Sequence, residues 1–74
     1  MIVCRLTYED GDTFDTRHRT REKAEQSLFD SANEYVKENP EDSRLRKLVE
    51  SGDAGGTAKH LWDNYLLKVE ILGS

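Results

Sequence analysis

The chain has 74 residues, a net charge of −4, one cysteine and 35% hydrophobic residues. A chain of this length forms one domain, 1–74, with a small core, and its acidic balance argues against a general affinity for nucleic acids or anionic membranes. One cysteine excludes an intramolecular disulfide, and Cys4, His18 and His60 make no zinc site without carboxylates.

The first eighteen residues predict a β-hairpin whose register follows from its side chains. A two-residue turn at Asp10-Gly11 is the first candidate, because Asp-Gly pairs are typical of tight hairpins. That turn places Phe14 on the face opposite Leu6, which divides the apolar residues between the two faces. A three-residue loop over residues 9–11, with Gly11 left-handed, brings Phe14 opposite Leu6 instead.

The three-residue loop also produces favourable neighbours on both faces of the hairpin. Opposite charges and paired threonines that face each other across two strands contribute about 0.2–1 kcal/mol each. The other predicted pairs are Ile2 with His18, Cys4 with Thr16, Arg5 with Asp15, and Thr7 with Thr13. Because both faces agree on one register, we prefer it.

Apolar residues at helical spacing predict a helix from an N-cap at Thr20 to about Glu38. Asn39-Pro40 ends it, because a residue before proline is pushed out of helical geometry. The same Asn39 is predicted to cap a second helix, with Pro40 at its first position and Gly52 just past its end. The predicted apolar stripes are Ala24, Leu28, Ala32, Tyr35 and Val36, and then Leu45, Leu48 and Val49.

The glycine-rich segment 51–56 predicts a flexible connector, followed by a single helical turn capped by Thr57. Alternating side chains over residues 65–72 predict a third strand of undecided direction. We therefore expect an α+β fold of order β-β-α-α-β, with two helices on one face of a three-stranded antiparallel or mixed sheet. The first strand is placed in the middle, because it and the third strand are the most apolar.

No catalytic set emerges from the sequence, so we expect no enzyme, metal or cofactor. A nucleophilic cysteine needs a nearby base and partial exposure, whereas Cys4 is predicted to be an inert core residue with His18 diagonally across the hairpin. His60 has no evident partner and is predicted to lie at the surface or its boundary. The segment 52–59 lacks the preceding strand and the Gly-Lys-Ser/Thr order of a phosphate-binding loop.

Acidic side chains form the leading candidate surface for a partner. Spaced carboxylates can imitate phosphates and occupy a basic groove on a nucleic-acid-handling protein, although most charged helix faces only confer solubility. Lys23 and Lys37 interrupt the acidic stripe of the first helix. The candidate partner-binding residues are Glu9, Asp10, Asp12, Glu22, Asp30 and Glu34.

A basic segment at the junction between the second strand and the first helix is the alternative site. Helix N-termini favour anions, so a phosphate or an acidic partner would fit there. We rank this site lower because binding patches for nucleic acid usually show in the net charge. Its residues are Arg17, Arg19, Arg21 and Lys23.

The small size, the acidic surplus and the lack of a catalytic set resemble the inhibitors that phages make against host defences, such as anti-CRISPR proteins. The resemblance is one of type and transfers no residue. We expect a binding module that occupies a nucleic-acid-binding protein in the cytoplasm, which is the host cytoplasm for a phage-encoded chain. It would bind no membrane, since no apolar run is long enough to span one and the first residues form no signal peptide.

Two alternatives to this function remain open. One is a nucleic-acid or phosphate binder that uses the basic segment 17–23. The other is a structural homodimer through the last strand, where Leu66 and Leu72 are predicted to face outward.

Overall fold

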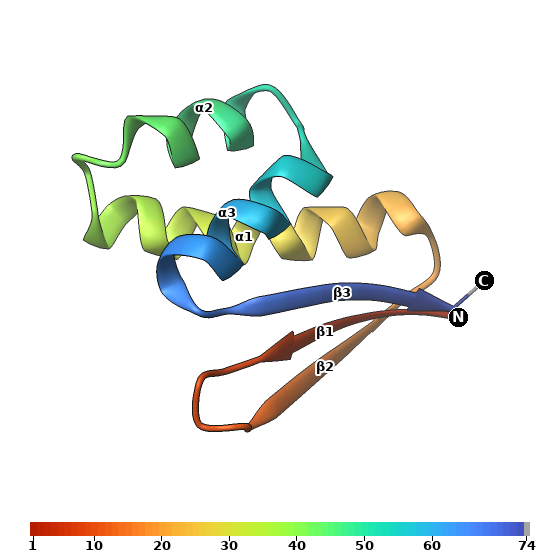
Figure 1. The fold of residues 1–74 in the computed structure, drawn as a ribbon. Helices are drawn as coiled ribbons and strands as arrows, with labels where there is room; N and C mark the ends of the chain where they lie inside the picture. Colours follow the sequence, from red (N-terminus) through yellow and green to blue (C-terminus); the bar gives the residue numbers. More distant parts are fainter. Residues whose placement is uncertain (74) are drawn as a thin grey trace.

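The computed structural model describes residues 1–73, which form one antiparallel sheet and three helices (Figure 1). The elements are β1 (Ile2–Thr7), β2 (Thr13–His18), α1 (Arg21–Glu38), α2 (Ser43–Glu50), α3 (Ala54–Tyr65) and β3 (Lys68–Gly73). The strand order is β2-β1-β3, and both neighbours of β1 run antiparallel to it. The predicted α+β class and the central place of the first strand are confirmed.

The predicted hairpin register is confirmed at every pair. Gly11 has a φ of +92°, and the Tyr8 amide donates to the Asp12 carbonyl at 2.8 Å, so three residues make the loop. On the open face of the sheet, Arg5 forms two hydrogen bonds to Asp15, at 2.9 and 3.0 Å. Local alternation and one left-handed glycine are therefore enough to specify this hairpin.

Phe14 lies opposite Leu6, as predicted, but it stays largely exposed. It pairs with Leu6 and so shares the helix-facing side, but its side chain is 58% exposed. The reason is its position, because β2 is an edge strand and the hairpin bends away from the helices at its loop (Figure 1).

The first helix follows its prediction, and the start of the second does not. Thr20 caps α1 by accepting a hydrogen bond from the Lys23 amide at 3.2 Å. Asn39 does not cap α2, because its side-chain amide donates to the Tyr35 carbonyl at the end of α1. The cap of α2 is Asp42, which accepts from the Leu45 amide at 3.0 Å.

The predicted two helices are three, because α3 begins at Ala54, so the second half of the glycine-rich segment 51–56 is helical and only residues 51–53 connect the helices. Gly52, with a φ of +72°, ends α2, and Asp53 then caps α3 by accepting from the Gly56 amide at 2.8 Å. Thr57 is therefore a buried residue inside α3 and not a cap. Gly56 has a packing role, since a Cβ there would lie 2.9 Å from Leu48 of α2.

The predicted third strand begins later than expected. Tyr65 ends α3, and Leu66 adopts a left-handed conformation with a φ of 55° while the Leu67 amide donates back to the Leu61 carbonyl. The strand starts at Lys68. Leu66 is 44% exposed, but it terminates a helix, so the prediction that it lies in the last strand with Leu72 is wrong.

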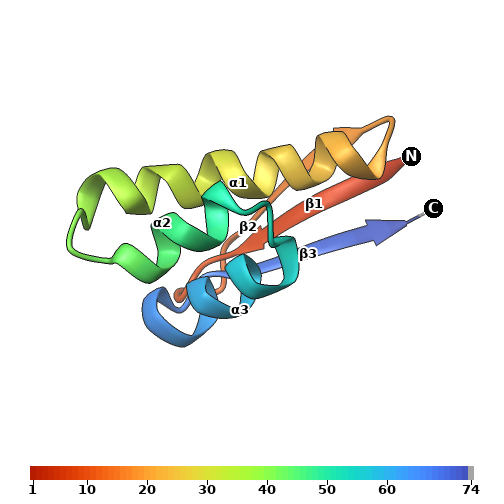
Figure 2. The ribbon, with the colours of Figure 1, turned by 90° about the horizontal axis from the view of Figure 1, so that it is seen from above.

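The core lies between the sheet and the helices α1 and α3, which cross it side by side (Figure 2). Helix α2 packs on those two helices and, within residues 1–73, approaches no strand. Cys4 is 1% exposed, and burial raises the pKa of its thiol, which agrees with its prediction as a core residue. The buried residues are Cys4, Leu6, Ala24, Leu28, Ala32, Leu45, Thr57, Leu61 and Leu67. No described helix is long and apolar enough to cross a membrane.

Candidate functional site

All three tyrosines of the chain line one open groove near the hairpin loop. Tyr8 follows β1, Tyr35 comes from the last turns of α1, and Tyr65 is the last residue of α3. The groove has a volume of about 620 Å³. We call it the tyrosine groove, and its lining residues are Tyr8, Glu9, Asp10, Tyr35, Tyr65, Leu66 and Leu67.

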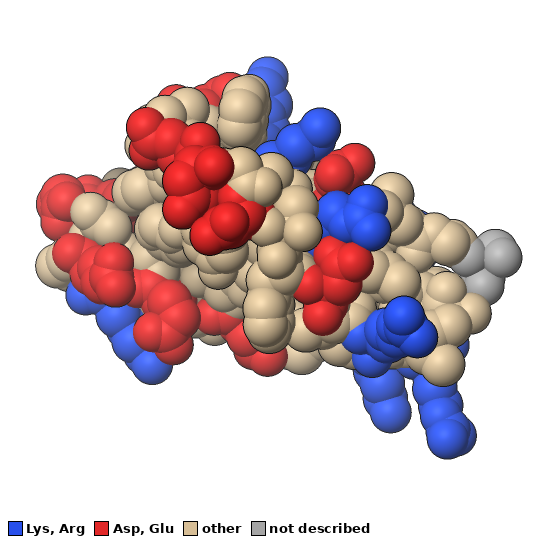
Figure 3. Space-filling view, turned by 90° about the horizontal axis from the view of Figure 1, so that it is seen from below, with Lys and Arg blue, Asp and Glu red and all other residues tan. Residues whose placement is uncertain are grey.

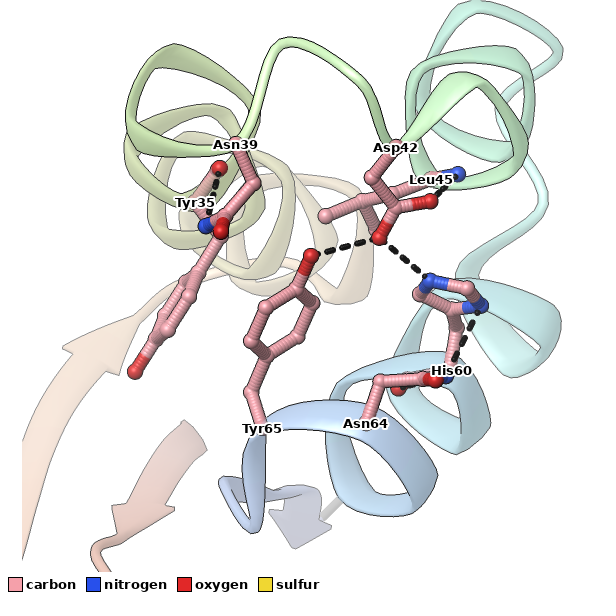
Figure 4. Close-up of polar contacts among 7 residues, drawn as sticks. All are labelled: Tyr35, Asn39, Asp42, Leu45, His60, Asn64 and Tyr65. Carbon is pink, nitrogen blue, oxygen red and sulfur yellow. Dashed lines mark hydrogen bonds and ion pairs between the residues drawn. The ribbon is translucent and has the colours of Figure 1, made fainter.

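One wall of the tyrosine groove is held by a hydrogen-bond network beside it (Figure 4). Tyr65 donates its phenolic hydrogen to Oδ2 of Asp42 at 2.5 Å, and Nε2 of His60 lies 2.8 Å from the same oxygen. The other carboxylate oxygen of Asp42 caps α2. One carboxylate therefore ties the start of α2 to two side chains of α3.

His60 is a boundary residue, as predicted, but it has partners that the sequence did not reveal. Its side chain is 11% exposed. Nε2 contacts Asp42, while Nδ1 lies 3.3 Å from the amide nitrogen of Asn64, which also donates to the His60 carbonyl (Figure 4). A general base needs a ring nitrogen open to a substrate, and both nitrogens here are occupied. The network therefore connects the last turns of α3 to the start of α2.

The network shifts the pKa values of the two groups that share its shortest bond. Burial alone would raise the pKa of Asp42, but the hydrogen bonds from Tyr65, His60 and the Leu45 amide lower it to about 2. Burial and then the bond to Asp42 raise the pKa of Tyr65 to about 12. At neutral pH Asp42 is a carboxylate and Tyr65 a neutral donor, which is the pairing that strengthens the bond.

The second wall of the tyrosine groove is Tyr35. Its ring centroid lies 4.8 Å from that of Tyr65, with an interplanar angle of 42°. Burial, followed by the proximity of Tyr8 and Glu38, raises the pKa of Tyr35. Because Tyr65 is held by Asp42 and Tyr35 packs against it, two aromatic walls of the groove are already in place.

Large apolar side chains are also exposed on α3 and β2, two elements that adjoin the lining of the tyrosine groove in sequence. Trp62 is 51% exposed and lies one helical turn before Leu66, which is 44% exposed, and Phe14 follows the hairpin loop. Monomeric proteins rarely expose several large apolar residues together unless the surface binds something. The tyrosine groove, Phe14 and Trp62 are called the hairpin-end surface below.

Comparisons of this chain with protein-family models, curated proteins and solved structures found no match.

The predicted acidic residues fall into separate groups. Glu9, Asp10 and Asp12 lie in or beside the hairpin loop, where Oδ1 of Asp10 accepts from the Asp12 amide at 3.0 Å. Glu9 and Asp10 line the tyrosine groove. Sequence reasoning proposed these two carboxylates but missed the tyrosines beside them, which come from three distant segments.

The acidic residues of α1 do not form one continuous stripe with the carboxylates of the hairpin loop. Glu22 lies in the first turn and Glu34 twelve residues later, which is about 18 Å along the helix axis. Asp30 accepts a hydrogen bond from Gln26 at 3.0 Å, and Glu34 forms an ion pair with Lys37 at 3.7 Å. Asp30 and Glu34 therefore already have polar partners on their own helix.

The predicted basic residues lie at the end of the molecule opposite the hairpin loop. Figure 3 shows the open side of the sheet, with acidic side chains predominating toward the loop end and basic side chains clustered where the termini lie. Arg17 is in β2, Arg19 precedes α1, and Arg21 and Lys23 lie in its first turn, where Arg21 pairs with Glu25 at 3.6 Å. Within residues 1–73, no group of three or more His, Cys, Asp or Glu side chains is placed to hold a metal ion.

Proposed function

We propose that this protein is a non-enzymatic binding module that occupies a basic surface of a protein partner through its hairpin-end surface. The observation that carries the proposal is the meeting of three tyrosines, of which Tyr8 is 42% exposed, with the loop carboxylates Glu9 and Asp10. Large aromatic side chains anchor interfaces, and complementary charges around them orient the partner and exclude others.

The proposed partner is a nucleic-acid-binding protein or complex. Such proteins carry basic grooves, and an acidic chain with a net charge of −4 is attracted to them. In its most concrete form, the proposal is a phage-type inhibitor of a host defence complex, acting in the host cytoplasm as anti-CRISPR proteins do.

The hairpin-end surface is a better contact than the acidic face of α1. Asp30 and Glu34 have partners on their own helix, and a bound protein would have to compete with them. In contrast, Glu9 makes no hydrogen bond or ion pair with any other residue of the described chain, 1–73. The three tyrosines also line one groove with Glu9, and Asp30 is not among the residues that line it.

The proposal is tested by capture of partners from host-cell extract, with purified variants as bait. The double variant Glu9→Lys with Trp62→Ala changes exposed side chains and should lose the captured complex. The matched variant Asp30→Lys with Glu34→Lys should retain it. If the first variant still captures the same complex, the proposal is wrong.

A third bait distinguishes binding through the hairpin-end surface from binding through the basic segment. The variant Arg17→Glu with Arg19→Glu alters the opposite end of the molecule and should capture the complex normally. Loss of capture with this variant alone would assign binding to the basic segment instead. Retardation of DNA or RNA that weakens with added salt would identify the bound molecule as nucleic acid.

A further inference from the structure

We propose that the tyrosine groove binds the guanidinium group of an arginine side chain on the partner. The inference deepens the proposed function and depends on it, because it names the chemical group that the hairpin-end surface recognises. The occupant is a basic segment of a protein rather than a small metabolite.

The first supporting feature is aromatic. Cations are attracted to the electron-rich faces of tyrosine rings within about 6 Å of the centroid. The tyrosine groove has three such rings, and the two that form its walls pack at 4.8 Å. The hydroxyl bond from Tyr65 to Asp42 holds one ring in place, so a ligand need not order it on binding.

The second feature is charge. Each ionisable group that lines the groove is acidic or a tyrosine, and its described lining contains no lysine, arginine or histidine. Glu9 is unpaired within residues 1–73, and Asp10 uses Oδ1 for the Asp12 amide, which leaves Oδ2 for a ligand. By contrast, the hollow next to His60 is lined by two cationic side chains, Arg44 and Lys59, against one carboxylate, Asp63, and is less suited to a cation.

Arginine fits this combination better than lysine. A guanidinium is planar, stacks on aromatic faces and presents five donors in a fork that matches a carboxylate, and it is less strongly hydrated than an ammonium. The groove is open and, at about 620 Å³, large enough for the side chain together with neighbouring backbone. A segment that presents arginine at a protein surface can therefore enter it.

The test is an NMR titration of the ¹⁵N-labelled full chain at low ionic strength with the peptide Gly-Arg-Gly, blocked at both ends. Saturable amide shifts are expected at Glu9, Leu66 and Leu67, with little change at residues of α2. The matched Gly-Lys-Gly peptide should bind more weakly, by about twofold or more, because an ammonium lacks the planar fork and the weaker hydration of a guanidinium.

Two variants locate the site and one controls for general charge. Glu9→Gln and Tyr8→Leu alter exposed lining residues, and each should weaken arginine binding at least twofold. Glu34→Gln removes an exposed carboxylate from α1 and should leave binding unchanged.

Several outcomes overturn the inference. They are the absence of saturable shifts at tens of millimolar peptide, equal binding of both peptides, and equal weakening by Glu34→Gln. These failures are distinct from failure of the proposed function. If partner capture still depends on Glu9 and Trp62 while the arginine peptide does not bind, the surface is correct and its ligand chemistry is wrong.

Discussion

Tyr65 and Asp42 are joined by a 2.5 Å hydrogen bond although 23 residues separate them in the chain. The bond links the last residue of α3 to the N-cap of α2 and fixes a wall of the tyrosine groove. Asp42 is only 16% exposed, so this contact is shielded from much of the solvent that weakens surface ion pairs.

Acid should destabilise the protein through Asp42. The pKa of Asp42 is about 2 in the folded chain, below the ordinary value of 3.8. The ionised carboxylate therefore stabilises the fold above pH 3.8, and this stabilisation is lost as the pH falls toward 2. The shift corresponds to about 2 kcal/mol at neutral pH. Urea unfolding at pH 7 and pH 2.5 measures the loss. In Asp42→Asn, which keeps a capping oxygen, stability should depend less on pH; an unchanged pH dependence would contradict the assignment.

Alkaline titration should detect the raised pKa of Tyr65. Its pKa is raised to about 12, so the stabilisation from its neutral form is present below pH 10 and is lost as the pH rises toward 12. Phenolate absorbance should therefore show one late step before alkaline unfolding. Tyr65→Phe should remove that step, whereas Tyr8→Phe should leave it; a late step that survives in Tyr65→Phe would assign it to another residue.

Two adjacent glycines of α3 should respond oppositely to alanine. A Cβ at Gly55 meets nothing closer than 4.0 Å, so Gly55→Ala should stabilise the protein by about 0.5–1 kcal/mol through helix propensity. A Cβ at Gly56 would lie 2.5 Å from the Asp53 carboxylate and 2.9 Å from Leu48. Gly56→Ala should therefore destabilise it by about 1–3 kcal/mol. Thermal unfolding compares the pair, and a shift of the same sign in both would refute the packing role of Gly56.

The buried hydroxyl of Thr57 should be a weak point of the core. It is fully buried, and Oγ1 has no hydrogen-bond partner in the described chain. Thr57→Val keeps the shape and removes the unpaired polar atom, so it should raise the free energy of unfolding by about 1–2 kcal/mol. Thr57→Ser keeps the hydroxyl and loses a methyl group, so it should lower stability. Destabilisation by valine would mean that the hydroxyl has a partner, such as a buried water.

The hairpin register, the span of α1 and the central position of β1 can all be predicted from the sequence. The register and the helix span depend on side-chain alternation, a glycine turn and an N-cap, which act over a few residues, and the central position of β1 follows from its apolar content. Tertiary structure decided what the segment after Gly52 becomes. Its glycines are weak helix formers, and the helix exists because Asp53 caps it and Leu61 is buried in the core.

The candidate site also came from tertiary structure. Tyr8, Tyr35 and Tyr65 follow no common motif, and Asp42 meets His60 and Tyr65 only because α2 packs against α3. Local patterns carry no information about such contacts, because the pairing energy depends on which helix faces meet. The sequence could therefore indicate that Glu9 and Asp10 lie on an exposed loop, and only the packed chain shows that aromatic rings surround them.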